Sequence, residues 1–281
     1  MDWRQATHHS VKFFKYFGQR CSADKINITA GHLTYVSLLS LVPLIVVMFT
    51  IFSAFPVFEQ LQRNIEEALI ANLLPTSGEQ LSSYIDEFVA NASKMTGIGI
   101  AFLFVVAVML ISAIDSTLNS IWRDTSKRRL TVSLAIYWMI LTLGPVLIGS
   151  GLAATSYLIS LTQFAEEYIS GVRSFALWLV PVITSFIAFV LLYQLVPNRT
   201  VRFRHAAFGA GIAAILFELG KQVFSLYITY FPTYQAIYGA LATIPILLVW
   251  IYLSWTIVLS GAELTVSLEE YQYLRKKKRA E

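Results

Sequence analysis

Charged side chains are scarce in this sequence. Asp, Glu, Lys and Arg make up 14% of its 281 residues, whereas hydrophobic residues make up 56%. Soluble domains carry about 25% charged residues, so this composition argues against an ordinary soluble protein. There is one cysteine, Cys21, which excludes a disulfide bond within the chain.

Motifs of the common catalytic chemistries are also lacking. The sequence contains no glycine-rich phosphate loop ending in Lys-Ser or Lys-Thr, no nucleophile elbow, no HExxH motif and no cluster of Cys and His residues. We therefore expect neither an ATP-driven pump nor an enzyme, and we expect no metal and no cofactor.

Six long apolar blocks dominate what is present. A run of 18 or more apolar residues is long enough to cross a bilayer as a helix. These blocks lack the alternation of membrane barrel strands. The sequence thus predicts an all-α polytopic membrane bundle over residues 33–262, with spans at Leu33–Phe55, Gly97–Ile121, Val132–Leu161, Phe175–Val196, Ala206–Thr229 and Ala240–Ala262.

Lys and Arg gather at alternate connections, which predicts the orientation. The amino-terminal segment, the loops after the second and fourth spans, and the carboxyl-terminal segment hold 17 of the 21 basic residues. By the positive-inside rule these parts are cytoplasmic, so both ends of the chain lie there. Residues 1–32 are expected to form an interfacial amphipathic segment and residues 263–281 a basic cytoplasmic tail.

The connection between the first two spans, residues 56–96, is predicted to be a helical periplasmic loop. Apolar residues recur there at helical spacing on both sides of Pro75, and Thr76 with Glu79 matches a capping box. Such helices either cover the outer end of the bundle or bind a protein partner in the envelope.

Ionisable side chains in the fifth span mark a first candidate site, because each costs about 2.5–3.5 kcal/mol near the middle of a bilayer. Glu218 and Lys221 are three residues apart, which allows an ion pair, and Gln222 and Ser225 continue the same polar face. Small residues around Gly209 would let a neighbouring helix approach closely. The lipid-facing side is predicted to carry Ile212, Leu216, Leu219, Val223 and Leu226.

A second polar cluster is predicted toward the cytoplasmic side. Asp115 and Asn119 lie near the end of the second span, and Glu263 ends the sixth. Polar residues at similar depth would line an inward-open vestibule: His32, Thr34, Ser37 and Ser112. A structural role, as a buried ion pair or as hydrogen bonds between helices, is the open alternative for both clusters.

Four stretches carry a resemblance to a known family. They are AGHLTYVSLLSLVPL (Ala30–Leu44), ISAIDSTLNSIWR (Ile111–Arg123), FELGK (Phe217–Lys221) and YGALATIPILLVWIYLSWTIVLSGAEL (Tyr238–Leu264). Over roughly residues 20–275 the chain resembles the YihY/BrkB family of bacterial inner-membrane proteins. The resemblance implies a six-helix protein in the inner membrane of a Gram-negative bacterium, and it supplies no catalytic residues.

Together these features favour a transporter or a lipid-handling protein of the cell envelope. Transporter sites commonly lie near the bilayer midplane, and a basic cytoplasmic rim would hold anionic headgroups of membrane lipids. The alternative is a scaffold that does not transport and docks an envelope protein through residues 56–96.

The resembled family has also carried a label as a ribonuclease that processes transfer RNA. Such chemistry would need a metal-organising carboxylate cluster on the cytoplasmic side, and none is visible in the sequence. No nucleic-acid-binding signature accompanies the basic tail either. We therefore do not expect a nucleic-acid partner.

Overall fold

The computed structural model describes residues 3–53, 97–124, 131–139, 142–143, 172–230 and 242–280. These residues form helices joined by short turns, and none of them lies in a strand. The helices are α1 Trp3–Ala23, α2 Ile26–Ser53, α5 Gly97–Ile121, α7 Val172–Leu195, α8 Phe203–Tyr230 and α10 Thr243–Ala280. Residues 131–139 are also helical. The predicted loop 56–96 and most of the predicted third span lie outside the described residues.

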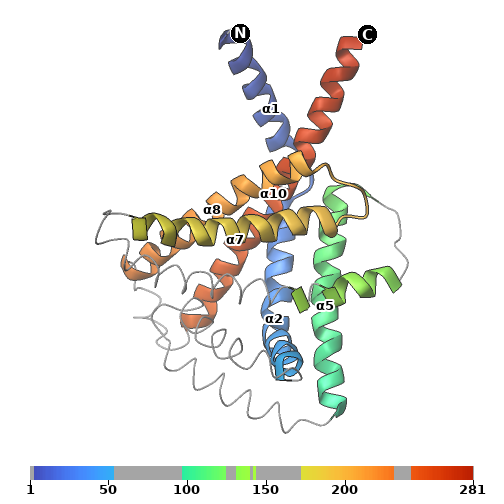
Figure 1. Cartoon of the computed structure of the whole chain (residues 1–281), viewed down its shortest axis with the longest axis vertical. Coiled ribbons are helices and arrows are strands. Elements are labelled where there is room, and N and C mark those ends of the chain that lie inside the picture. The colour runs from blue at the N-terminus through green and yellow to red at the C-terminus, as the bar shows by residue number, and fades with distance from the viewer. Residues whose placement is uncertain are drawn as a thin grey trace.

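Several helices are suited to a bilayer. Ala101–Ile121, Phe203–Tyr230 and Ile244–Leu274 are long and apolar enough to cross a membrane, and Leu179–Leu195 is a shorter apolar helix. The predicted helical membrane fold is confirmed at this level. Both termini lie at the same end of the molecule (Figure 1), as an even number of crossings requires. Six spans and a cytoplasmic location for that end stay predictions.

α5 ends where the sequence predicts, through a recognisable stop signal. Arg123 adopts a left-handed conformation with φ of 52°. The Arg123 backbone N–H donates to the Ser120 carbonyl at 2.9 Å, and the Asp124 N–H donates to the Asn119 carbonyl at 3.1 Å. These two bonds form a Schellman motif, which satisfies carbonyls that the helix end would otherwise leave without partners.

α10 has no such stop at the end of the predicted sixth span. It begins at Thr243 and continues past Ala262 to Ala280. The basic carboxyl-terminal segment therefore lies on the same continuous helix as the apolar span.

The other helices pack around α10. It contacts α1, α2, α5, α7 and α8, and it crosses the molecule among them (Figure 1). Leu33 of α2, Leu118 of α5 and Leu259 of α10 are completely buried in the shared core. Tyr193 of α7 is also completely buried, and its hydroxyl donates to the Val258 carbonyl of α10 at 2.7 Å.

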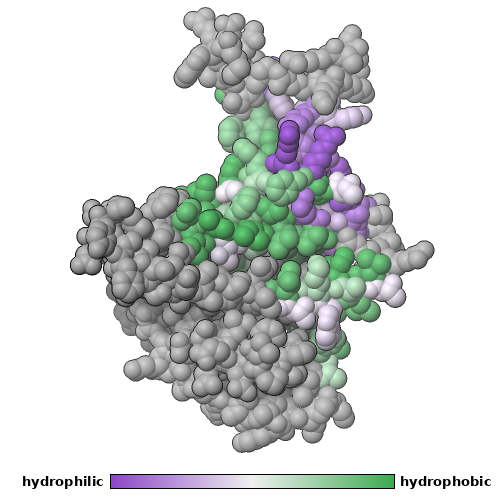
Figure 2. All heavy atoms as spheres, viewed as in Figure 1, coloured by the Kyte–Doolittle hydropathy of each residue, from purple (hydrophilic) through white to green (hydrophobic). Residues whose placement is uncertain are grey.

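The apolar face predicted for α8 is exposed, as expected of a surface in contact with lipid. The exposed fractions of its side chains range from 36% for Ile212 to 64% for Val223. One face of the molecule carries a broad apolar band, with hydrophilic residues beside it toward the end that holds the termini (Figure 2).

Small residues bring α8 and α10 into close contact. A Cβ atom added at Gly209 would lie 2.7 Å from the Gly261 carbonyl oxygen and would overlap the Thr265 hydroxyl. A Cβ added at Gly261 would lie 2.7 Å from the Ala213 Cβ and would overlap the Tyr193 hydroxyl. The prediction that a helix approaches closely at Gly209 is confirmed.

We expect Gly209→Ala to lower the melting temperature of the protein in detergent. Alanine favours helix by about 1 kcal/mol over glycine, but overpacking costs about 1–3 kcal/mol when the obstructing atom belongs to a backbone. Gly211→Ala is the matched control, because its nearest neighbour is a Phe186 ring carbon at 3.8 Å, an ordinary contact. Equal melting temperatures for the two variants would contradict the close approach.

Candidate functional site

A buried cluster of charged residues joins α1 to α10. Arg20 is 3% exposed and Glu263 is completely buried. The Arg20 Nε donates to Glu263 Oε2 at 2.9 Å, and Arg20 Nη1 donates to Glu270 Oε2. The Tyr16 hydroxyl donates to the same Glu270 oxygen at 2.5 Å, and Asp24 Oδ2 lies 3.5 Å from Arg20 Nη2. The guanidinium group of Arg20 thus forms ion pairs with three carboxylates.

Arg20 also closes the end of α5. Its Nη2 donates to the Ile121 carbonyl at 2.8 Å, and basic side chains commonly satisfy the last carbonyls of a helix in this way. Burial alone would lower the pKa of Arg20, but its hydrogen bond to Glu270 and the charge of Glu263 raise it. Arg20 therefore stays charged, and from α1 it keeps its bonds to α5 and α10.

Of this cluster, only Glu263 is a predicted site residue. Arg20 and Glu270 are 250 residues apart, so no local spacing connects them. The sequence does hold one signal, the spacing of seven residues between Glu263 and Glu270. Two helical turns separate them, so both carboxylates lie on one face of a helix. A basic side chain facing them would stabilise both.

Asp115 and Asn119 connect α5 to two other segments. Asn119 Nδ2 donates to Asp115 Oδ1 at 2.9 Å, and the Tyr137 hydroxyl donates to Asp115 Oδ2 at 3.1 Å. The Asn198 backbone N–H, in the turn after α7, donates to Asn119 Oδ1 at 2.7 Å. These hydrogen bonds link α5 to the helical residues 131–139 and to the turn after α7, as the structural alternative for this pair would require.

Glu218 and Lys221 form the ion pair that their spacing allows. Lys221 Nζ lies 2.7 Å from Glu218 Oε2, and the Ser185 hydroxyl of α7 donates to Glu218 Oε1 at 2.9 Å. Glu218 is buried, whereas the Lys221 side chain is 40% exposed. Gln222 and Ser225 are exposed. The inward polar face predicted for this helix therefore does not extend to these last two residues.

The four residues predicted to line a vestibule have different surroundings. Thr34 is buried and donates to the Ala30 carbonyl of its own helix, and Ser37 accepts a hydrogen bond from Trp255 Nε1 at 2.9 Å. His32 and Ser112 are exposed. Within the described ranges no hydrogen bond joins these four residues to one another.

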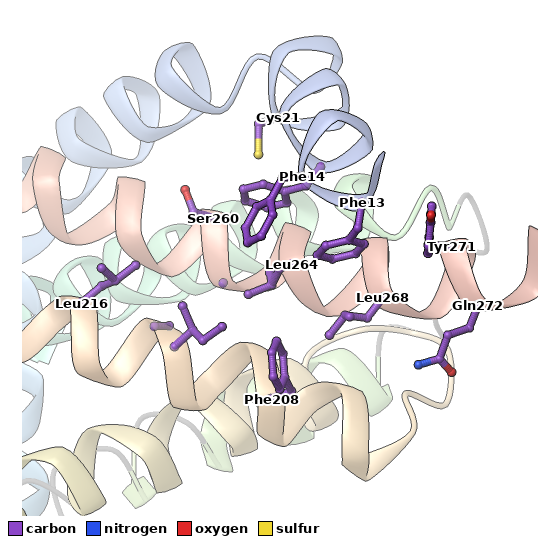
Figure 3. A pocket seen from close by; sticks show the side chains of 14 residues that line it. Phe13, Phe14, Cys21, Phe208, Leu216, Ser260, Leu264, Leu268, Tyr271 and Gln272 are labelled. Carbon is purple, nitrogen blue, oxygen red and sulfur yellow. The ribbon is translucent and has the colours of Figure 1, made fainter. Parts of the chain in front are cut away.

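An apolar groove runs between α1, α8 and α10. Its volume is about 730 Å³, inside the range of about 300–1,000 Å³ that is usual for ligand pockets. The rings of Phe13 and Phe14 point from α1 toward Phe208 of α8 across the groove (Figure 3). The apolar lining includes Phe13, Phe14 and Phe17 of α1, Phe208, Ile212 and Leu216 of α8, and Leu264 and Leu268 of α10.

Ring contacts fix one side of this groove. Phe13 and Tyr271 meet edge to face with their centroids 5.6 Å apart, and Tyr16 lies 6.1 Å from the same Tyr271 ring. Such aromatic pairs add about 0.5–1.5 kcal/mol beyond area burial. Together with Arg20, they hold α1 against α10 so that its phenylalanines form a wall.

Comparisons with known proteins identify the family of this chain. A sequence profile of the virulence factor BrkB family matches residues 17–281. The chain belongs to this family. A UPF0761 membrane protein of Idiomarina loihiensis is 73% identical over 272 residues, which cover 97% of this chain and 96% of the relative. UPF0761 membrane proteins of Vibrio parahaemolyticus and Aeromonas salmonicida are 52% and 53% identical over 94% of this chain, covering 84% and 91% of those relatives.

No solved structure matches the chain. The resemblance read from the four sequence stretches is confirmed by the family match and by the relatives. The relatives are named membrane proteins, and several helices of this chain are able to span a bilayer. The chain is a multi-pass protein of a bacterial inner membrane, as the sequence predicted.

We expect Arg20→Gln to destabilise the protein strongly. Removing one partner of a buried ion pair leaves an uncompensated charge and costs about 3–5 kcal/mol. Arg123→Gln is the control, because the Arg123 side chain is 58% exposed and lies 3.9 Å from Asp24, a geometry worth about 0–1 kcal/mol. Melting temperatures in detergent test this expectation, and equal values for both variants would contradict it.

A double variant tests whether the fold needs the Arg20–Glu263 ion pair or only side chains of similar size at these positions. Arg20→Met combined with Glu263→Met removes both members of the pair, and such replacements are often neutral. The double variant should therefore melt at a higher temperature than Arg20→Met alone. A double variant that is less stable than the single one would show that Glu263 stabilises the fold without Arg20.

Cys21 should react slowly with alkylating reagents. Burial, with the charges of Glu263 and Asp24, raises its pKa from 9.0 to about 11. Because the thiolate is the reactive form, its fraction at pH 8 falls by about a hundredfold, and the rate should still rise as pH approaches 11. The pH dependence of iodoacetamide modification measures this. Ser22 is exposed, so Cys21→Ser combined with Ser22→Cys provides a fast-reacting control.

Proposed function

We propose that this protein handles a membrane lipid, crosses the inner membrane six times with both ends in the cytoplasm, and has no catalytic activity. The groove between α1, α8 and α10 is the observation that carries the proposal. It has the volume of a ligand pocket, mostly apolar walls, and an exposed apolar surface of α8 beside it. A lipid chain could pass from the bilayer into such a groove without crossing water.

The position of the groove supports a ligand from the cytoplasmic leaflet. Its walls come from the amino-terminal helix, the start of α8 and the second half of α10. These segments adjoin the loops and ends that carry most of the Lys and Arg residues. Positive charges near a bilayer surface attract anionic lipid groups by about 1 kcal/mol each.

The carboxylates around Arg20 offer little support for metal-assisted hydrolysis of a nucleic acid. Glu263, Glu270 and Asp24 share the guanidinium of Arg20, and Glu270 also accepts from Tyr16. Metal-assisted hydrolysis needs carboxylates that face a metal and a substrate. Salt-bridged side chains with protein partners are better suited to holding helices together.

The Glu218–Lys221 pair favours a second candidate, a transporter of a small solute. The pair lies within a helix that can span the membrane, and the Lys221 side chain is 40% exposed. Intramembrane charges of this kind often mark solute or ion pathways. The scaffold alternative depends on residues 56–96, which lie outside the described part of the chain.

Native mass spectrometry of the protein released from its own membrane tests lipid binding. We expect wild-type protein to retain lipid, and we expect Ile212→Trp to lose most of it because the added ring fills the groove. Val223→Trp is the matched control, since Val223 is an exposed apolar residue of the same helix that does not line the groove. Equal retention in all three proteins would overturn the lipid-handling proposal.

Glu218→Gln distinguishes the two candidates in the same measurement. Glu218 faces Ser185 of α7 and does not line the groove, so lipid retention should be unchanged. Loss of lipid in Glu218→Gln but not in Ile212→Trp would move the binding site to the α7–α8 side. Loss of solute uptake in Glu218→Gln vesicles, with lipid retention equal in all variants, would support the solute transporter.

A further inference from the structure

A polar pocket adjoins the apolar groove, and the two share one residue. The pocket has a volume of about 330 Å³ and is lined by Arg199, Arg202, Glu269, Glu270 and Tyr273, together with Gln272. Gln272 also lines the groove, and Figure 3 shows it at the end of the groove beyond Leu268 and Tyr271. Gln272 thus borders an apolar groove and a charged pocket.

The pocket holds charges of both signs. Arg199 Nη2 lies 3.1 Å from Glu269 Oε1, in a pair that is partly exposed. Glu270 is bound by Arg20 and Tyr16. Arg202 is exposed, and none of the described residues forms an ion pair or a hydrogen bond with its guanidinium group. Arg202 is therefore available to an outside anion. The Glu269 carboxylate lines the same pocket.

The apolar groove alone cannot give selectivity among lipids that have the same acyl chains. A chain that moves from the bilayer into an apolar groove exchanges one apolar environment for another, so little free energy distinguishes the two. Selection has to come from the polar group, because an unpaired charge in a site is costly and a paired one is not. The charges of the pocket thus define the headgroup.

We propose that groove and pocket together bind one zwitterionic phospholipid whose headgroup carries a phosphate and a primary ammonium group. The proposal rests on the lipid-handling function given above and names its ligand class. Arg202 binds the phosphate, since a guanidinium matches phosphate oxygens in geometry and charge. Glu269 accepts hydrogen bonds from the ammonium group, and Arg199 keeps Glu269 in place. The Gln272 amide lies where the ester carbonyls join headgroup to chains.

Competition among three lipids with identical dioleoyl chains tests this assignment. The full-length protein is stripped of native lipid in detergent and incubated with equal amounts of phosphatidylethanolamine, phosphatidylglycerol and phosphatidylcholine. Native mass spectrometry then counts the bound species. We expect phosphatidylethanolamine to exceed the other two, because phosphatidylglycerol lacks the cation and the trimethylated amine of phosphatidylcholine cannot donate hydrogen bonds.

Three variants locate the selectivity. Arg202→Gln should lower retention of phosphatidylethanolamine by about tenfold, the effect of losing one hydrogen bond to a charged group. Glu269→Gln should remove the preference over phosphatidylglycerol while retaining lipid. Arg204→Gln is the charge-matched control, because Arg204 is exposed and lines neither the pocket nor the groove. Its lipid profile should equal that of the wild type.

The outcomes distinguish this inference from the function on which it rests. Wild-type protein that binds all three lipids equally, or prefers phosphatidylglycerol, overturns the headgroup assignment and leaves lipid handling intact. Wild-type protein that retains none of the lipids overturns both. Equal losses of phosphatidylethanolamine in Arg202→Gln and Arg204→Gln would assign the effect to net charge at the surface. That result would also overturn the assignment of the headgroup to the pocket. The wild-type competition decides the headgroup even if a variant fails to fold.

Discussion

Where α8 crosses α10, Gly209 and Gly261 leave no room for a side chain between the two backbones. Inside a bilayer, burial of apolar surface does little to drive helices together, so close van der Waals packing has to supply the attraction. α10, one partner in this contact, also touches each of the other helices α1, α2, α5 and α7. Gly261 also lines the groove. The close contact of α8 with α10 at Gly261 therefore forms part of the groove wall.

The buried charges fix the position of α1 against α10 and α5. A carboxylate as deeply buried as Glu263 is tolerable only with a partner, and Arg20 provides one while also binding Glu270 and the last turn of α5. Apolar packing alone would allow α1 to slide along the bundle, whereas directional hydrogen bonds fix its position. The groove depends on that position, since α1 supplies one of its aromatic walls.

The parts of the fold that depend on local pattern were predictable from the sequence. The bounds of α5, the close approach at Gly209, the ion pair of Glu218 with Lys221 and the exposed apolar side of α8 all follow from composition or spacing within one helix. The Arg20 cluster and the groove were not predictable in this way. Both unite residues of α1 with residues of α10, at the opposite end of the chain, and no helical periodicity encodes such a distant pairing. α10 exceeds its predicted span because nothing in the sequence after Ala262 stops a helix: the segment holds no glycine or proline.

The separation of Arg20 from its partners has a consequence for the timing of assembly. Arg20 leaves the ribosome about 250 residues before Glu270, which at roughly 5–20 residues per second corresponds to a delay of about 12–50 s. During that interval Arg20 has neither Glu263 nor Glu270 to bind, and the groove lacks the wall formed by α10. The groove therefore forms only as synthesis finishes. A chain released early, even one with most of its spans inserted, has no complete groove to occupy.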